Sequence, residues 1–238
     1  MRASAKNHQR VTVLTDPLDY DQVLDEIENK GNVQPKTRLR LATKVYSLVS
    51  KYDSLIASYL YKFTENNNGL MDENISIDAR ELSKLRYGEN PHQKAKLYEI
   101  INPHLTKFAY TQLSGKALSF NNLVDTESAF SCVKQFDMPS CVIVKHANPC
   151  GVASSNSLGD SYNSAYKTDP TSAFGGIITF NKKVDHQLIS KILEKQFVEV
   201  IAAPGFDKET MDVIQKKPNV RLLKIKLKKK KDVVYETK

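Results

Sequence analysis

Short runs of apolar residues alternate with amphipathic stretches along the second half of the chain, and this pattern restricts the possible folds more than any other feature. The apolar runs, rich in β-branched residues, predict buried strands at residues 141–144, 176–180, 198–202 and 220–225. The stretches before and between them predict helices at residues 125–136, within 151–167 after a loop, at 185–196 and at 207–216. Strands that alternate with helices pack as an α/β fold, with the helices against a mixed or parallel sheet.

The start of the chain predicts one more strand and a first helix. Residues 11–14 (VTVL) are mostly β-branched and predict a strand. Asp16 and Pro17 follow, and this pair is typical of a helix start, with Asp as the cap and Pro in the first turn. The helix is predicted to run to Lys30 and to end at Gly31.

A second helix is predicted after Pro35. Apolar residues recur there at spacings of three and four, which indicates a helix with one buried face. These residues are Leu41, Val45, Leu48, Val49, Tyr52, Ile56, Tyr59 and Leu60. Residues 66–69 (NNNG) then predict a turn or a linker.

The positive charge of the chain is concentrated near one end. The formal net charge is +8, and residues 216–231 contain nine basic and no acidic residues. The rest of the chain therefore carries −1 (+8 minus +9). The basic residues of nucleic-acid-binding surfaces are usually spread over the folded domain. A positive charge concentrated near one end therefore argues against a nucleic-acid partner. The basic tail could still bind RNA or an acidic membrane surface, although a terminal charge run is more often simply solvated.

The composition excludes several protein classes. With 40% hydrophobic and 26% charged residues, the chain is neither collagen-like nor disordered throughout. No window approaches the roughly 18 apolar residues that a membrane span needs, and the N-terminus lacks a signal-peptide core. The three cysteines, Cys132, Cys141 and Cys150, are odd in number and have no close pair. We therefore expect no disulfide framework and a cytoplasmic location.

Lys145 and His146 are the strongest candidates for catalysis. They follow the predicted strand at 141–144, and ligands commonly bind at strand ends in open α/β sheets. A histidine there can accept a proton near neutral pH, and a neighbouring ammonium can stabilise negative charge. The alternative is an ordinary polar loop after a strand.

Two further segments could contact a ligand. Residues 86–93 (RYGENPHQ) place an Arg and a His on a Gly/Pro-constrained loop, which suits a phosphate or carboxylate, or else is only an exposed polar loop. Residues 169–176 (DPTSAFGG) place two glycines before a strand, where they permit close backbone approach to a ligand. Neither a GxxxxGK[ST] loop nor a GxGxxG motif is present.

Pro149-Cys150 matches part of the zinc-deaminase signature, which would indicate a zinc site. The second cysteine of that signature is replaced by Ala153, and no H-x-E precedes it. We therefore predict no metal, and Cys150 as a small packed residue.

Five segments, in order, resemble one enzyme family. They are LRYGENPHQ (85–93), LSFNNLVDTESAF (118–130), VIVKHANPCGVA (142–153), DPTSAFGGIITFN (169–181) and QFVEVIAAPGF (196–206). Together with RASAKNHQRVTVLTDPLDYDQVL (2–24), they are similar to the bifunctional AICAR transformylase/IMP cyclohydrolase family of purine biosynthesis. The resemblance extends from residue 2 to about residue 221.

The resemblance implies an activity and a set of site residues. The transformylase of this family moves a formyl group from 10-formyltetrahydrofolate, a co-substrate, to AICAR, and the cyclohydrolase then closes the ring to IMP. By this match Lys145 and His146 are the catalytic pair, and Lys6 is a cyclohydrolase active-site lysine. The match also assigns substrate contacts to Arg86, Tyr87, His92, Asn122, Gly175 and Glu199.

The resemblance also implies a domain organisation. Residues 70–226 are expected to form the first of two cytidine-deaminase-like α/β units of a transformylase domain. Residues 1–69 are expected to be the end of a methylglyoxal-synthase-like cyclohydrolase domain with connecting helices, and residues 227–238 a basic tail. The intact family works as a homodimer on AICAR and folate.

Family members are about twice as long as this chain, so we expect a fragment or a truncated reading frame. Of the cyclohydrolase site only Lys6 has a counterpart, and we expect that activity to be lost. The alternative function is a catalytically incomplete nucleotide-binding fragment, or one half of a split enzyme.

Overall fold

The computed structural model describes residues 1–61, 63, 77–101 and 109–226. The chain divides into two compact units, Met1–Asp78 and Ala79–Lys238. The predicted linker at residues 66–69 and the basic tail at 227–238 lie outside the described residues. No helix within the described ranges combines the length and the hydrophobicity needed to cross a membrane.

The first unit is helical in its described part. Its elements are α1 (Arg2–Lys6), the short 3-10 helix η1 (Pro17–Asp19), α2 (Tyr20–Lys30) and α3 (Pro35–Tyr61). The predicted helix start is confirmed, because the Asp16 side chain accepts a hydrogen bond from the Leu18 N–H. The predicted end is confirmed as well, because Gly31 adopts a left-handed conformation with φ 70°.

The predicted strand at residues 11–14 is wrong. This segment is neither helix nor strand, and no β-strand occurs among the described residues of the first unit. Val13 instead packs against Ala5, Ala42 and Val45. A β-branched run forms a strand only where another strand pairs with its backbone, and here the apolar side chains are buried against helices instead.

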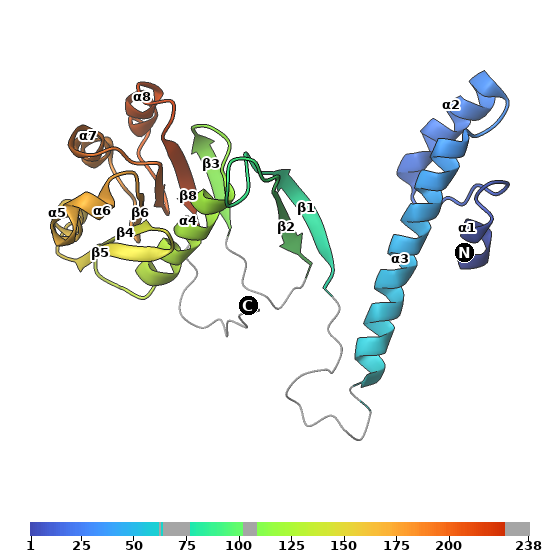
Figure 1. The fold of residues 1–238 in the computed structure, drawn as a ribbon, viewed down its shortest axis with the longest axis horizontal. Coiled ribbons are helices and arrows are strands. Elements are labelled where there is room, and N and C mark those ends of the chain that lie inside the picture. Colours follow the sequence, from blue (N-terminus) through green and yellow to red (C-terminus); the bar gives the residue numbers. More distant parts are fainter. Residues whose placement is uncertain (62, 64–76, 102–108, 227–238) are drawn as a thin grey trace. The chain divides into compact units, whose positions relative to one another are not determined.

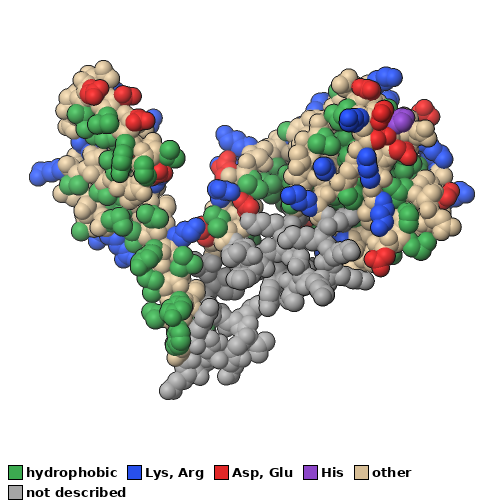
Figure 2. Space-filling view, turned by 180° about the vertical axis from the view of Figure 1, so that it is seen from behind, with side chains coloured by type: hydrophobic (Ala, Val, Ile, Leu, Met, Phe, Trp, Pro, Cys, Tyr) green, Lys and Arg blue, Asp and Glu red, His purple; other side chains and the backbone are tan. Residues whose placement is uncertain are grey.

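The predicted buried face of α3 is only partly confirmed. Leu41 and Val45 are buried against the other elements of the unit. The apolar residues farther along the helix are exposed: Leu48, Tyr52, Leu55, Ile56, Tyr59 and Leu60. Figure 2 shows apolar side chains distributed along the body that contains α3. The spacing identified the helix correctly, but these six apolar side chains remain exposed, although Asp53 and Lys51 in the same part of the helix pair with Arg2 and Asp78.

The second unit contains two sheets. A two-stranded antiparallel sheet pairs β1 (Ala79–Lys84) with β2 (Lys96–Ile100). A six-stranded mixed sheet has the order β3-β8-β7-β6-β4-β5, in which β6, β7 and β8 are parallel and the other pairs are antiparallel. Its strands are β3 (Tyr110–Ser114), β4 (Ser140–Lys145), β5 (Asn148–Ser154), β6 (Ile177–Phe180), β7 (Val200–Ala203) and β8 (Arg221–Ile225). The prediction of an α/β fold with a mixed sheet is confirmed.

Helices cover both faces of the six-stranded sheet (Figure 1). They are α4 (Phe120–Val133), α5 (Leu158–Thr168), α6 (Pro170–Ala173), α7 (His186–Lys195) and α8 (Thr210–Gln215). In β4, Cys141 and Ile143 pack into the core beneath α5, α7 and α8, whereas Val142 and Val144 pack against α4. This alternation places the central strands between two apolar layers, so each strand is almost fully buried.

Three details of the second unit differ from the prediction. Helix α4 begins at Phe120 rather than at 125, because Ser119 and Asn122 form a reciprocal capping box. Residues 148–154, predicted to belong to a turn and a loop, form strand β5. Strands β1, β2 and β3 were not predicted, because their exposed or half-exposed residues lack an apolar run.

An ion pair joins the start of α7 to the loop before α8. His186 Nδ1 lies 2.7 Å from Asp207 Oδ2, and the hydrogen bond raises the pKa of His186 above 6.5. Burial by itself would raise the pKa of Asp207, but hydrogen bonds from Thr210 and His186 hold that pKa below its usual range. Glu209 lies near this pair, so His186, Asp207 and Glu209 form a cluster of possible metal ligands. Both Asp207 oxygens already accept hydrogen bonds, from Thr210 and His186, and we therefore assign no metal to this cluster.

We expect this pair to make stability depend on pH. A raised histidine pKa adds stability that is complete below about pH 6.5 and is lost as the pH rises through the folded-state pKa. A lowered aspartate pKa adds stability that is lost only in acid. The wild type should therefore exceed His186→Gln in unfolding free energy most between about pH 4 and 6.5, with the difference shrinking toward pH 8. Denaturant titrations across this range test the expectation, with His8→Gln as the control. A difference that grows toward pH 8 would contradict it.

Candidate functional site

The turn between β4 and β5 carries the predicted catalytic pair. The two strands are antiparallel, and only His146 and Ala147 connect Lys145 to Asn148. Both connecting residues have positive φ angles, 53° and 59°, which residues other than glycine adopt rarely. Two-residue hairpins favour such a turn because its twist matches that of the strands. The turn exposes the His146 side chain at the end of the sheet.

Asp125 of α4 holds this turn. One oxygen of its carboxylate accepts a hydrogen bond from the Ala147 N–H at 2.7 Å, and the other accepts one from the His146 N–H at 3.2 Å. The Asn148 side chain also donates to the His146 carbonyl at 2.8 Å. Both amides of the turn are thus bound by one carboxylate from a neighbouring helix.

Lys145 joins the turn to residues 169–176, the glycine segment. Its Nζ donates a hydrogen bond to the Phe174 carbonyl at 2.9 Å. Gly175 follows with φ 73°, and a Cβ on Gly176 would come within 3.0 Å of the Val144 carbonyl oxygen. The glycines therefore let this segment pass close to the end of β4, so that at Gly176 the close approach is to the protein's own backbone.

Asn122 links α4 to the loop before β7. It lies one helical turn before Asp125, and its Nδ2 donates to Glu199 Oε2 at 2.8 Å. Asn122 is buried, and its own side-chain oxygen accepts from the Ser119 N–H. Helix α4 therefore positions both the turn and this carboxylate.

Arg221, at the start of β8, lies beside the same carboxylate. Its NH1 is 3.7 Å from Glu199 Oε2, and its side chain is only 6% exposed. Burial lowers the pKa of Arg221. The negative charge of Glu199 raises that pKa, and the positive charge of nearby Arg86 lowers it. The buried Nε has no hydrogen-bond partner among the described residues. Asn122 and Arg221 thus share the Glu199 carboxylate, and the Arg86 guanidinium adds a second positive charge near Arg221, which leaves a net positive charge suited to an anion.

The predicted loop at residues 86–93 connects β1 to β2 and contacts the start of α4. The Arg86 N–H donates to the Leu118 carbonyl at 2.9 Å, and the Phe120 N–H donates to the Tyr87 carbonyl at 3.1 Å. The Arg86 guanidinium lies 5.5 Å from the centre of the Tyr87 ring. His92 is exposed on this loop.

The structure therefore connects seven of the predicted residues. Through α4 and the Phe174 carbonyl, contacts link the elements that bear Arg86, Tyr87, Asn122, Lys145, His146, Gly175 and Glu199. For His92, no hydrogen bond to another candidate residue occurs among the described interactions. Lys6 is exposed at the end of α1 and belongs to the other unit.

Sequence reasoning missed Asp125 and Arg221. Asp125 lies three residues after Asn122, so the helical period would have placed both on one face. Arg221 lies inside the apolar run predicted at residues 220–225, and a charged residue there is a signal for a buried charge with a specific partner.

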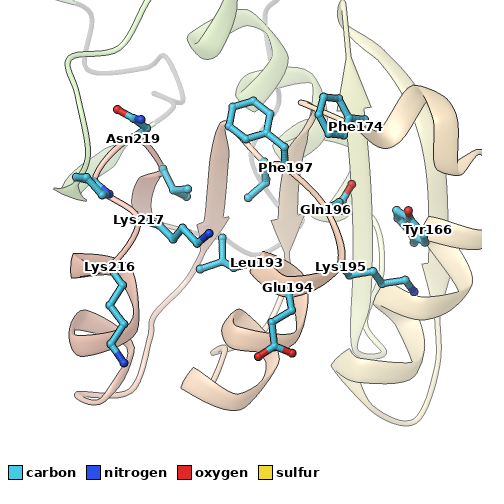
Figure 3. Close-up of a pocket in the computed structure, with 13 residues that line it drawn as sticks. Tyr166, Phe174, Leu193, Glu194, Lys195, Gln196, Phe197, Lys216, Lys217 and Asn219 are labelled. Atoms are coloured by element: carbon cyan, nitrogen blue, oxygen red, sulfur yellow. The ribbon is translucent and has the colours of Figure 1, made fainter.

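A cavity of about 540 Å³ lies beside the glycine segment (Figure 3). Phe174 and Phe197 line it, with ring centres 5.6 Å apart. Lys195 also lines it, and its Nζ lies 4.2 Å from the centre of the Tyr166 ring. Aromatic rings combined with lysines suit a planar ligand that carries negative charge.

Cys150 is packed against the core of the unit, as predicted. Burial raises the pKa of its thiol, and so do the nearby charges of Asp169 and Asp125, although Lys145 acts against them. A raised thiol pKa disfavours the thiolate, which is the form that attacks substrates and binds metals.

Comparisons with known proteins agree with the resemblance. The family model described as AICARFT/IMPCHase bienzyme matches residues 4–238. A bifunctional purine biosynthesis protein PurH from Caldicellulosiruptor saccharolyticus is 43% identical over 241 aligned residues. That match covers 100% of this chain and 46% of the relative, so the chain spans about half the length of the curated relative it matches.

Proposed function

The chain belongs to the AICARFT/IMPCHase bienzyme family, and on this basis we propose that it takes part in purine biosynthesis as an AICAR formyltransferase. The reaction transfers the formyl group of 10-formyltetrahydrofolate to the 5-amino group of AICAR. The observation that carries this proposal is the tight turn that presents Lys145 and His146 next to the glycine segment.

The chemistry explains why this pair is suitable. The amine of AICAR is a weak nucleophile because its lone pair is delocalised into the imidazole ring. His146 accepts a proton from this amine as the nitrogen attacks the formyl carbon. The tetrahedral intermediate then collapses as the bond between the formyl carbon and N10 of the folate breaks, and N10 takes up the proton from His146 as tetrahydrofolate leaves. The Lys145 ammonium stabilises the negative charge that develops on the formyl oxygen. Among the described residues, Lys145 Nζ donates one hydrogen bond, to the Phe174 carbonyl. An ammonium group has three N–H donors, so others remain for the oxyanion.

We assign AICAR binding to the α4 side of the site. Arg86 and Arg221 give the positive charge that a ribose phosphate needs, and Tyr87 and His92 lie on the same loop as Arg86. The aromatic cavity beside Phe174 suits the planar ring of the folate. No metal is assigned to the reaction.

Replacing Arg86 by alanine should weaken AICAR binding to this chain at least tenfold, or about 1.4 kcal/mol. The reason is the loss of a charged contact to the phosphate. Isothermal titration calorimetry measures this, with Arg80→Ala as the control, because Arg80 is an exposed arginine of β1 paired with Glu99. Equal affinities for the Arg86 and Arg80 variants would remove Arg86 from the binding site.

The finer assignments of fold and assembly belong to the same proposal. Residues 70–226 are proposed to be the first cytidine-deaminase-like unit of the transformylase domain, and residues 1–69 the end of the cyclohydrolase domain. A homodimer is proposed, and the exposed apolar residues of α3 support it as a surface suited to a partner. The free cysteines support a cytoplasmic location.

A second candidate function is nucleotide binding without turnover, and the positive charge of Arg86 and Arg221 beside the start of α4 favours it. The experiment that separates the two mixes this chain with the part of the Caldicellulosiruptor relative that it does not match. Formylation of AICAR by the mixture supports the transferase. AICAR binding without formylation supports the binding function, and absence of both overturns both candidates.

A further inference from the structure

The turn that carries Lys145 and His146 has a conformation that its residues do not favour. His146 and Ala147 both have side chains, yet both adopt left-handed φ angles of 53° and 59°. Residues held in such conformations persist where the surroundings over-determine them, and they cluster at functional sites. Contacts from outside the turn are therefore needed to maintain it.

The only carboxylate hydrogen-bonded to the turn amides within the described residues is Asp125. Its two oxygens bind the N–H groups of His146 and Ala147 separately, and it is anchored on a helix of 14 residues. The same helix binds Glu199 through Asn122, one turn earlier. Helix α4 therefore binds both the turn that carries His146 and the carboxylate of Glu199.

We propose that Asp125 is the positioning residue for the Lys145–His146 pair. By binding both turn amides it keeps the two left-handed residues in place, and this directs the His146 ring and the Lys145 amine toward the reacting groups. The proposal rests on the proposed formyl transfer for its catalytic consequence. The effect on the turn itself can be measured without any activity.

The first test uses this chain alone. In Asp125→Ala, amide hydrogen exchange at His146 and Ala147 should accelerate at least tenfold, and the ring signals of His146 should shift in NMR spectra. Glu127→Ala is the matched control, because Glu127 is an exposed carboxylate two residues along the same helix. Asp125→Asn keeps one oxygen acceptor and should give an intermediate result. Exchange rates and ring signals equal to those of the control would overturn the proposal.

The second test separates positioning from general stability. With the remaining part of the relative supplied, Asp125→Ala should lower kcat for formylation about 10–100-fold with a much smaller change in the KM for AICAR. Adding Ala147→Gly should recover several-fold of the loss, because glycine adopts a positive φ without steric cost. Equal losses in kcat and affinity, or no recovery with glycine, would contradict the positioning role. If the wild-type mixture does not formylate AICAR, the proposed function fails, while the exchange measurement still decides whether Asp125 holds the turn.

Discussion

Replacing His146 by alanine is expected to reduce the rate of AICAR formylation by about 10²–10⁴-fold, the usual contribution of a general base. The protein tested is the chain supplied with the remaining part of its relative. AICAR binding should change far less than in Arg86→Ala, because a base acts mainly in the transition state. Single-turnover kinetics together with calorimetry separate the two effects.

Lys145→Ala should lower the rate by a comparable factor, because the ammonium that stabilises the oxyanion is lost. The double variant should lose less than the product of the two single losses, since both residues act on one addition step. Lys182→Ala serves as the control, because Lys182 is an exposed lysine in the loop after β6. Near-wild-type turnover in His146→Ala would reduce the pair to a structural turn.

Replacing Gly151 by alanine is expected to destabilise the second unit by about 3 kcal/mol, at the upper end of what overpacking usually costs. A Cβ at this position would lie 1.9 Å from the Ala165 carbonyl oxygen and 2.7 Å from its carbonyl carbon. Both contacts are with the backbone of α5, so no rotation of a side chain relieves them. Helix α5 would have to move away from β5, the strand that supports the His146 turn.

Thermal unfolding measures this effect, and a fall in melting temperature of roughly 6–12 °C corresponds to the expected loss. Gly159→Ala is the matched control, because the nearest heavy atom to its added Cβ would be Ser157 Oγ at 3.8 Å. Since Gly159 lies within α5, alanine there should leave stability unchanged or raise it by up to about 1 kcal/mol. Equal melting temperatures for the two variants would show that α5 and β5 are not packed as closely as described.

The central strands and their helices were predictable from sequence because their signals are local. The strands at β4, β6, β7 and β8 are apolar runs flanked by turns, and α7 begins at its capping residue, Asp185. By contrast, residues 11–14 have the composition of a strand but do not form one, because strand formation also requires a pairing partner that local sequence does not specify.

The candidate site was predictable in its residue types but not in its geometry. Lys145, His146 and Arg86 were identified from residue chemistry and from the family resemblance. The hairpin was missed, because residues 148–154 contain a proline and a glycine and are mostly exposed. Asp125 was missed because its role depends on two amides more than 20 residues away along the chain.

The sequence by itself therefore determined the α/β class, the order of the central strands and helices along the chain, and the family. These depend on periodicity, capping and short motifs, all of which act over a few neighbouring residues. Only the tertiary structure decided that α4 holds both the His146 turn and Glu199, and that Arg221 shares a carboxylate with the Asn122 side chain. Such contacts join residues that are far apart in sequence, and they form only when packing of the apolar layers brings their elements together.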